Sequence, residues 1–147
     1  MSHRDEQAEE AVIGAVLMGA TRAQVFNVRA EDFTDKRIWV WEAIETLFAA
    51  GRAVDTLTLT ETLHRQGRLA DAGGPAAIMR LEERGRLTED GGVQTRALAE
   101  HVAILRDRSM RRKLAAQAKR LEAMTYDLNL APESIAGGAV QALLASD

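Results

Sequence analysis

The pattern of apolar positions predicts helices along most of the chain. Apolar residues return every three or four positions in two early segments, Glu6–Met18 and Asp35–Ala50, as they do on the buried face of a helix. Each segment is followed by a glycine, Gly19 or Gly51, a residue that favours the left-handed end of a helix. Between them the pattern indicates a short helix from Thr21 to Val28, with its first threonine as the N-cap.

One stretch departs from this helical pattern. Residues 53–63, AVDTLTLTETL, alternate apolar and polar side chains as a strand does. No second strand is available to pair with it, and a lone strand is not stable. The candidates for a helix N-cap are Asp55, Thr56 and Thr58. Because Thr58 and Glu61 have the spacing of a capping box, we predict a helix from Thr58 to Gln66.

The second half of the chain is dominated by one predicted long helix. A short helix from Gly73 to Glu83 comes first, and the glycine pair at 91–92 marks a turn. No glycine or proline interrupts residues 93–124, which predicts a single helix there. Its apolar stripe changes side partway, by roughly 120–140°. The first face holds Leu98, Val102 and Leu105, and the second holds Met110, Leu114, Leu121 and Met124. We expect the first face to pack on the body of the protein and the second on something else.

A returning helix would complete a hairpin. Residues 129–132 read as a turn, and residues 132–145 as a helix that runs back along the long one. The sequence therefore predicts an all-α fold in two parts. Residues 1–92 form a helical head of about five helices, and residues 93–147 form a helical hairpin that leads into a linker.

Composition agrees with a single globular domain. The chain has 147 residues and no cysteine, so it has neither a disulfide framework nor a cysteine-ligated metal site. No apolar run approaches the roughly 20 residues of a membrane span. Its first residues lead into an acidic segment and not into the core of a signal peptide. We expect a cytoplasmic protein.

Charge is distributed unevenly along the sequence. The segment from Arg106 to Arg120 holds seven basic residues and one acid, a local charge of +6. Because the net charge of the chain is −3, the other residues together carry −9. One interpretation is that this basic helix neutralises phosphates of a nucleic acid. The other is that its arginines pair with acids of a neighbouring subunit. Stacking aromatics are missing nearby, Tyr126 being the closest, which favours the second interpretation.

The sequence lacks the motifs of an enzyme. None of the three lysines follows a glycine, so there is no phosphate loop for ATP. The histidines are scattered, and Glu61–His64 is a single Glu-x-x-His where a di-iron bundle needs two. No serine or threonine has the setting of a nucleophile elbow. We therefore expect no catalytic residue, no metal and no cofactor in this chain.

Three residues are candidates for contact with a partner. Trp39 points roughly 140° away from the buried face of its predicted helix, so it is either partly buried or turned toward a partner. Arg111 and Arg112 lie at the centre of the basic run. These residues suggest a non-catalytic interaction module.

Several short motifs follow one another along the first part of the chain. Residues 9–17 read EEAVIGAVL, residues 31–33 read EDF, residues 41–47 read WEAIETL and residues 51–59 read GRAVDTLTL. Leu63, Gly67–Leu69 and the glycines at 73–74 come next. In order and spacing this set resembles the N-terminal domain of the DnaB-type replicative DNA helicases, although Ala53 stands where that family usually has proline. The resemblance covers residues 9 to about 121.

The resemblance implies a function as well as a fold. It implies a helical head followed by a hairpin, pairing of the domains, and in the full helicase a collar built as a hexamer from three pairs. It implies docking of primase, and of a helicase loader, on that collar. The hairpin residues Met110, Leu114, Leu121 and Met124 would then form the oligomer interface, and DNA would be contacted only through the full-length, ATP-dependent helicase.

Two alternatives stay open at this point. The chain is either a piece of a full helicase or a natural stand-alone copy that competes for replication partners. A rival hypothesis is a helical nucleic-acid-binding or helicase-regulating protein that uses the basic helix at 106–120.

Overall fold

The computed structural model of the chain describes residues 3–88 and 95–145, which contain helices and loops and no strand. The α-helices are α1 (Glu6–Leu17), α2 (Arg37–Ala49), α3 (Thr56–Arg65), α4 (Gly74–Thr88), α5 (Thr95–Thr125) and α6 (Pro132–Ala145). Two short 3-10 helices, η1 (Arg22–Val25) and η2 (Ala30–Asp32), link α1 to α2. The predicted all-α fold class is confirmed.

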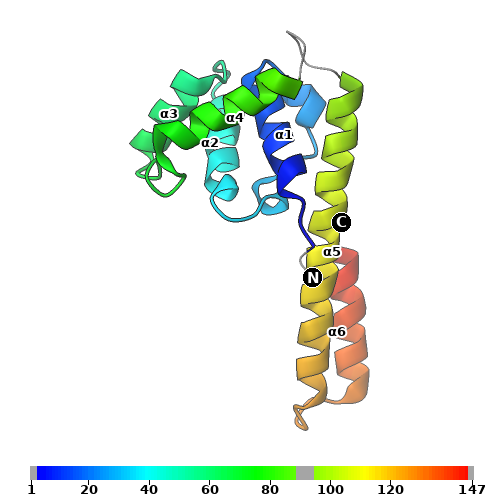
Figure 1. Cartoon of the computed structure of the whole chain (residues 1–147). Coiled ribbons are helices and arrows are strands. Elements are labelled where there is room, and N and C mark those ends of the chain that lie inside the picture. Colours follow the sequence, from blue (N-terminus) through cyan, green and yellow to red (C-terminus); the bar gives the residue numbers. More distant parts are fainter. Residues whose placement is uncertain (1–2, 89–94, 146–147) are drawn as a thin grey trace.

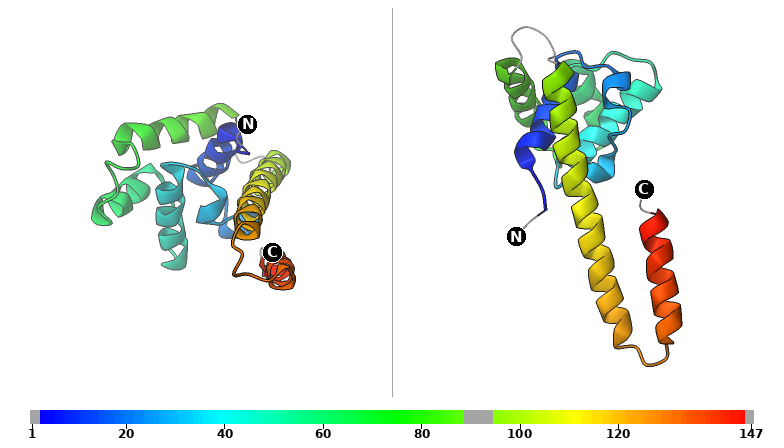
Figure 2. Two further views of the ribbon diagram at one scale, coloured as in Figure 1. Left: turned by 90° about the horizontal axis from the view of Figure 1, so that it is seen from below. Right: turned by 90° about the vertical axis from the view of Figure 1, so that its right-hand side faces the viewer.

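The molecule is a helical head with a projecting hairpin. Figure 1 shows α1 to α4 gathered beside the first half of α5, which then continues beyond them. α6 turns back and runs antiparallel along the second half of α5, and the right-hand view in Figure 2 shows most of this pair projecting below the head. The long helix is therefore shared: one half belongs to the head and the other to the hairpin.

The core of the head is built around α1 and α2. Ile13 of α1 and Trp41 and Ile44 of α2 are completely buried, and Leu59 and Ile78 close the core from α3 and α4. The ring of Trp41 stacks on Phe33 at a centroid distance of 4.9 Å. Its indole N–H donates to Glu45 Oε1 at 3.1 Å, so the polar atom of this buried ring is satisfied.

A buried ion pair fastens α1 to the start of α2. The Glu9 side chain is only 1% exposed, and its Oε1 accepts from Arg37 Nε at 3.0 Å and from the Thr34 backbone N–H at 2.6 Å. Since a buried carboxylate is tolerated only when paired and hydrogen-bonded, Glu9 determines where the loop before α2 lies.

The segment that alternates like a strand is the helix α3, but its predicted capping box is wrong. Asp55 is the N-cap: its carboxylate accepts from the Thr58 backbone N–H at 2.8 Å, while Thr58 Oγ1 accepts from the Asp55 N–H at 2.9 Å. The box therefore lies three residues earlier than the proposed Thr58–Glu61 box. Glu61 instead pairs with Arg65 one turn further on.

Other predicted boundaries agree to different degrees. α1 and α6 lie where the sequence placed them, whereas α4 runs on to Thr88. The segment after Thr21 is only one 3-10 turn, although Thr21 is its N-cap as predicted. α2 begins at Arg37 because Asp35, with φ of 55°, is in the left-handed region that a helix excludes. The predicted turn at 91–92 and the first residues of the long helix lie outside the described residues.

Candidate assembly interface on the helical hairpin

The predicted change of side along the long helix is confirmed. Leu98 and Leu105 of α5 are each 1% exposed and belong to the core of the head. Further along the same helix, Leu114 is 46% exposed and Leu121 is 37% exposed. α5 has left α1 to α4 by this point, and α6 is the element of the described chain that runs along its second half (Figure 1).

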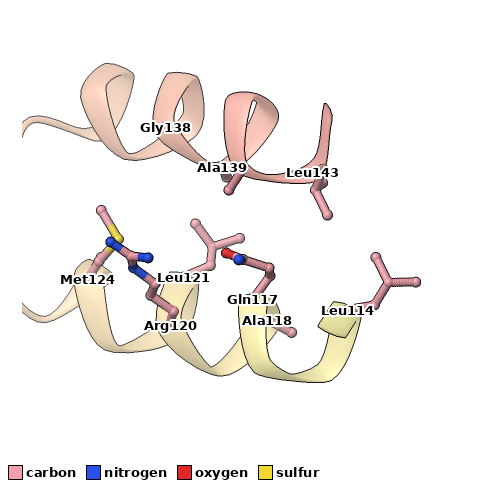
Figure 3. Close-up of a pocket in the computed structure, with 10 residues that line it drawn as sticks. Leu114, Gln117, Ala118, Arg120, Leu121, Met124, Gly138, Ala139 and Leu143 are labelled. Atoms are coloured by element: carbon pink, nitrogen blue, oxygen red, sulfur yellow. The ribbon is translucent and has the colours of Figure 1, made fainter. Parts of the chain in front are cut away.

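α6 covers that face incompletely and leaves a groove between the two helices. The groove has a volume of about 320 Å³. In Figure 3 the side chains of Leu121 and Met124 point toward α6, and that of Leu143 points back toward α5. The residues of α5 that line it are Leu114, Gln117, Ala118, Arg120, Leu121 and Met124, and those of α6 are Gly138, Ala139, Ala142 and Leu143.

Three of the four predicted hairpin residues therefore come together. Leu114, Leu121 and Met124 line the groove, whereas Met110 does not. Met110 is half-buried and lies one turn closer to the head.

The second wall of the groove was missed by the sequence reasoning. Ile135 is the one residue of α6 that is buried, and Val140, Leu143 and Leu144 are 57%, 47% and 73% exposed. The last three have the i, i+3, i+4 spacing of a helical apolar stripe, but of these only Leu143 lines the groove, beside the small residues Gly138, Ala139 and Ala142. With Ile135 as its one buried residue, α6 leaves Val140, Leu143 and Leu144 largely exposed to solvent.

Most of the basic run contacts acids and carbonyl groups of its own chain. Arg106 Nη1 lies 3.3 Å from the carboxylate of Asp32, which is completely buried in η2. Arg112 donates to the backbone oxygen of Asp32 at 3.0 Å and to that of His3 at 2.8 Å. Lys113 Nζ lies 2.9 Å from Glu31 Oε1. The basic helix thus joins the head to the start of the hairpin through the Glu31–Asp32 turn.

The remaining basic residues of the run, as far as the structure describes the chain, form no ion pair with the head. Arg108 and Arg111 both pair with Asp107 on the same helix. The pKa of Asp107 is lowered, chiefly by the hydrogen bond from Arg111. Within the described part of the chain, Lys119 and Arg120 form no ion pair. Of the two arginines predicted to contact a partner, Arg112 is turned onto the head and Arg111 stays exposed.

Trp39 lies apart from the hairpin. Its side chain is half-buried against the core, and the guanidinium of Arg68 lies 5.4 Å from its ring centroid. Cation–π contact with Arg68 is therefore one reason for an aromatic residue at this position.

Two further findings concern membranes and metals. Within residues 3–88 and 95–145 no helix combines the length and hydrophobicity needed to cross a membrane. No three histidine or acidic side chains of the same residues gather into a possible metal site.

Comparison with protein families identifies the fold. The family model of the DnaB-like helicase N terminal domain matches residues 1–106. The chain belongs to this family. No curated protein sequence matches the chain.

Solved structures extend the likeness of this DnaB-like N-terminal domain to the hairpin. The N-terminal domain of DnaB helicase from Mycobacterium tuberculosis is similar with a TM-score of 0.84 and 20% identity, covering 99% of both chains. A DnaB-like replicative helicase, described together with its interactions with primase, gives a TM-score of 0.74 at 21% identity over 97% of this chain. The chain spans 32% of that helicase. At these identities the likeness shows a shared fold, hairpin included.

Proposed function

We propose that this DnaB-like N-terminal domain is the oligomerisation and primase-docking module of a replicative DNA helicase. Its hairpin pairs with the hairpin of a second copy, and in the full helicase three such pairs form a hexameric collar. The module itself carries out no catalysis. The ATP-dependent motor belongs to the full-length protein, which works in the cytoplasm.

The observation that carries the pairing is the open groove on the hairpin. Leu114, Leu121 and Leu143 leave between a third and a half of their surface in water. Full burial of an exposed leucine contributes about 1.5–3 kcal/mol, so covering the part still in water would contribute roughly a third to a half of that for each side chain. A two-fold pair buries the same three side chains on both copies. The hairpin stands away from the head, so a second hairpin could reach the groove along its length (Figure 2).

Primase docking is supported by family membership and by one similar structure. The structure of the DnaB-like replicative helicase that shares this fold is described together with that helicase's interactions with primase. A helicase loader is a second protein that a collar of this kind could receive.

The rival function, nucleic-acid binding by the basic helix, finds less support. Arg106, Arg112 and Lys113 are engaged by the head, and Arg108 and Arg111 by Asp107. Among the described residues of the basic run, Lys119 and Arg120 are the two that have neither an ion pair nor a hydrogen-bond acceptor. Two exposed cations make a weak electrostatic footprint for a nucleic acid.

The test combines the mass of the particle with capture of primase. Light scattering coupled to size exclusion should give a mass that rises with concentration toward the dimer or hexamer. Immobilised domain should retain purified primase from the same organism, and domain carrying Leu121→Glu should remain folded but monomeric. A wild-type domain that stays strictly monomeric and does not retain primase would overturn the proposal.

A further inference from the structure

A polar pocket lies where the hairpin leaves the head. It is formed between the η1–η2 segment, α5 and the last turn of α6, and it has a volume of about 480 Å³. Its polar lining consists of Asn27, Arg29, Glu31, Arg106, Lys113 and Gln117. This junction pocket is separate from the apolar groove, although Gln117 contributes to both.

The junction pocket has an excess of positive charge. Three cations line it, Arg29, Arg106 and Lys113, against one carboxylate, Glu31. The buried Asp32 carboxylate behind Arg106 supplies a second negative charge. Lys113 is matched by Glu31 and Arg106 by Asp32, so the charge of Arg29 is left over.

The guanidinium N–H groups that line the pocket are not all hydrogen-bonded to groups of the described residues. Within the described residues, the exposed side chain of Arg29 has neither a hydrogen-bond acceptor nor an ion-pair partner. Arg106 is bonded to Asp32 through Nη1 alone, at 3.3 Å. That bond holds its guanidinium in place while its other N–H groups stay available. The fixed planar fork of a guanidinium matches the oxygens of a phosphate better than a lone ammonium does.

We propose that the junction pocket binds a phosphate group, held by Arg29 and Arg106 with Lys113 at its side. The group could be free phosphate, the phosphate of a nucleotide, or one phosphodiester of a nucleic acid strand. All three present the same oxygens to the two guanidinium groups.

The electrostatics of Glu31 agree with a positive field in the pocket. The pKa of Glu31 is lowered, first by the hydrogen bond from Lys113 and further by the charges of Arg29 and Arg106. Three cations thus act on one carboxylate at the rim. A phosphate entering the pocket would meet the same cations, and the Glu31 side chain, about half exposed, has room to turn aside.

Arg29→Gln is the informative variant. Within the described residues the side chain of Arg29 has no hydrogen bond or ion pair to lose, and the bond that shapes η2 is made by its backbone N–H to Asp32 Oδ2 at 2.8 Å. Removal of Arg106 would instead leave the buried Asp32 unpaired and destabilise the head. Arg111→Gln is the matched control, because it removes the same charge from an exposed residue of α5 that does not line the pocket.

The experiment is a titration of the ¹⁵N-labelled domain at constant ionic strength. The probes are inorganic phosphate, thymidine 5′-monophosphate and a ten-residue oligothymidylate, each balanced with sodium chloride. We expect saturable shifts of the amide signals of residues 27–31 and 113–117. Arg29→Gln should weaken binding about ten-fold or more, as expected for one charge-assisted bond, and Arg111→Gln should leave it unchanged.

The three probes distinguish the source of the phosphate. Binding of phosphate and the mononucleotide would support a small-molecule site, and binding of the oligonucleotide alone would assign the pocket to a nucleic-acid backbone. Shifts that do not saturate with any probe would overturn the proposal, as would equal affinity in wild type and Arg29→Gln. The domain's state of assembly is measured separately, so this result is independent of the function proposed above.

Discussion

α1 and α4 cross with their backbones in contact at Gly14 and Gly85. A Cβ atom added to Gly85 would lie 2.4 Å from the carbonyl oxygen of Gly14, and one added to Gly14 would lie 2.9 Å from the backbone of Gly85. Both sides of the contact are main chain, so no side-chain rotation can relieve a clash. The two glycines therefore set how closely α4 approaches the core that α1 carries.

Gly85→Ala should destabilise the head. The methyl group can be accommodated only if the two helices move apart, and overpacking of this kind costs about 1–3 kcal/mol. Urea denaturation should show that loss in the free energy of unfolding. Gly137→Ala in α6 is the control: its added Cβ meets nothing within 4 Å, so the better helix propensity of alanine should stabilise by up to about 1 kcal/mol. Equal effects of the two changes would contradict the close crossing.

Asp55→Ala should destabilise the domain more than Glu61→Ala does. Asp55 satisfies a backbone N–H at the start of α3, and loss of an N-cap costs about 1 kcal/mol. Glu61 forms only an exposed pair with Arg65, which contributes about 0.5 kcal/mol or less. The two variants are compared by thermal unfolding at the same protein concentration. A larger loss for Glu61→Ala would restore the capping box that the sequence alone suggested.

Leu143→Glu should weaken self-association of the domain. The side chain lies in the α6 wall of the groove, where a second hairpin would bury the new charge at a cost of several kcal/mol. Sedimentation equilibrium should show the dimer dissociation constant raised by about ten-fold or more. Leu57→Glu is the matched control, since Leu57 is 76% exposed at the start of α3, on the head. If both variants associate like wild type, the groove is not the pairing surface.

The carboxyl of Glu31 should titrate below its ordinary pKa, and Lys113→Gln should move it upward. The lowered pKa comes first from the hydrogen bond that Lys113 donates. Because the folded-state pKa lies below the unfolded one, the pair stabilises the fold above the unfolded pKa, and this contribution is lost as the pH falls through the folded pKa. A ¹³C titration of the Glu31 side-chain carboxyl measures its pKa in the wild type and in Lys113→Gln. Arg111→Gln should leave the midpoint of Glu31 where it is.

Local features of the sequence predicted much of the fold. The spacing of apolar residues located α1 and α2, since one face of each of these helices must be buried wherever its neighbours lie. The absence of glycine and proline located α5, and the turn at 129–132 located α6. The change of stripe between Leu105 and Leu114 predicted that one helix serves both head and hairpin. Capping was less decisive, because several polar residues around the start of α3 could each accept from a free backbone N–H. The alternation of apolar and polar residues at 53–63 also suits a strand as well as a helix.

What the sequence determined by itself is the set of helices, the family, and the existence of an apolar face on the hairpin. Tertiary structure alone decided what those faces meet. Asp32 and Arg106 are 74 residues apart in the sequence, and Glu31 and Lys113 are 82 residues apart. No local pattern can therefore predict that the basic helix forms ion pairs with the Glu31–Asp32 turn of its own head. The crossing at Gly14 and Gly85 and the groove wall that Leu143 forms with the small residues of α6 arise in the same way. Spacing along a helix says which residues share a face, but the packing of distant helices determines which face is covered and which is left for a partner.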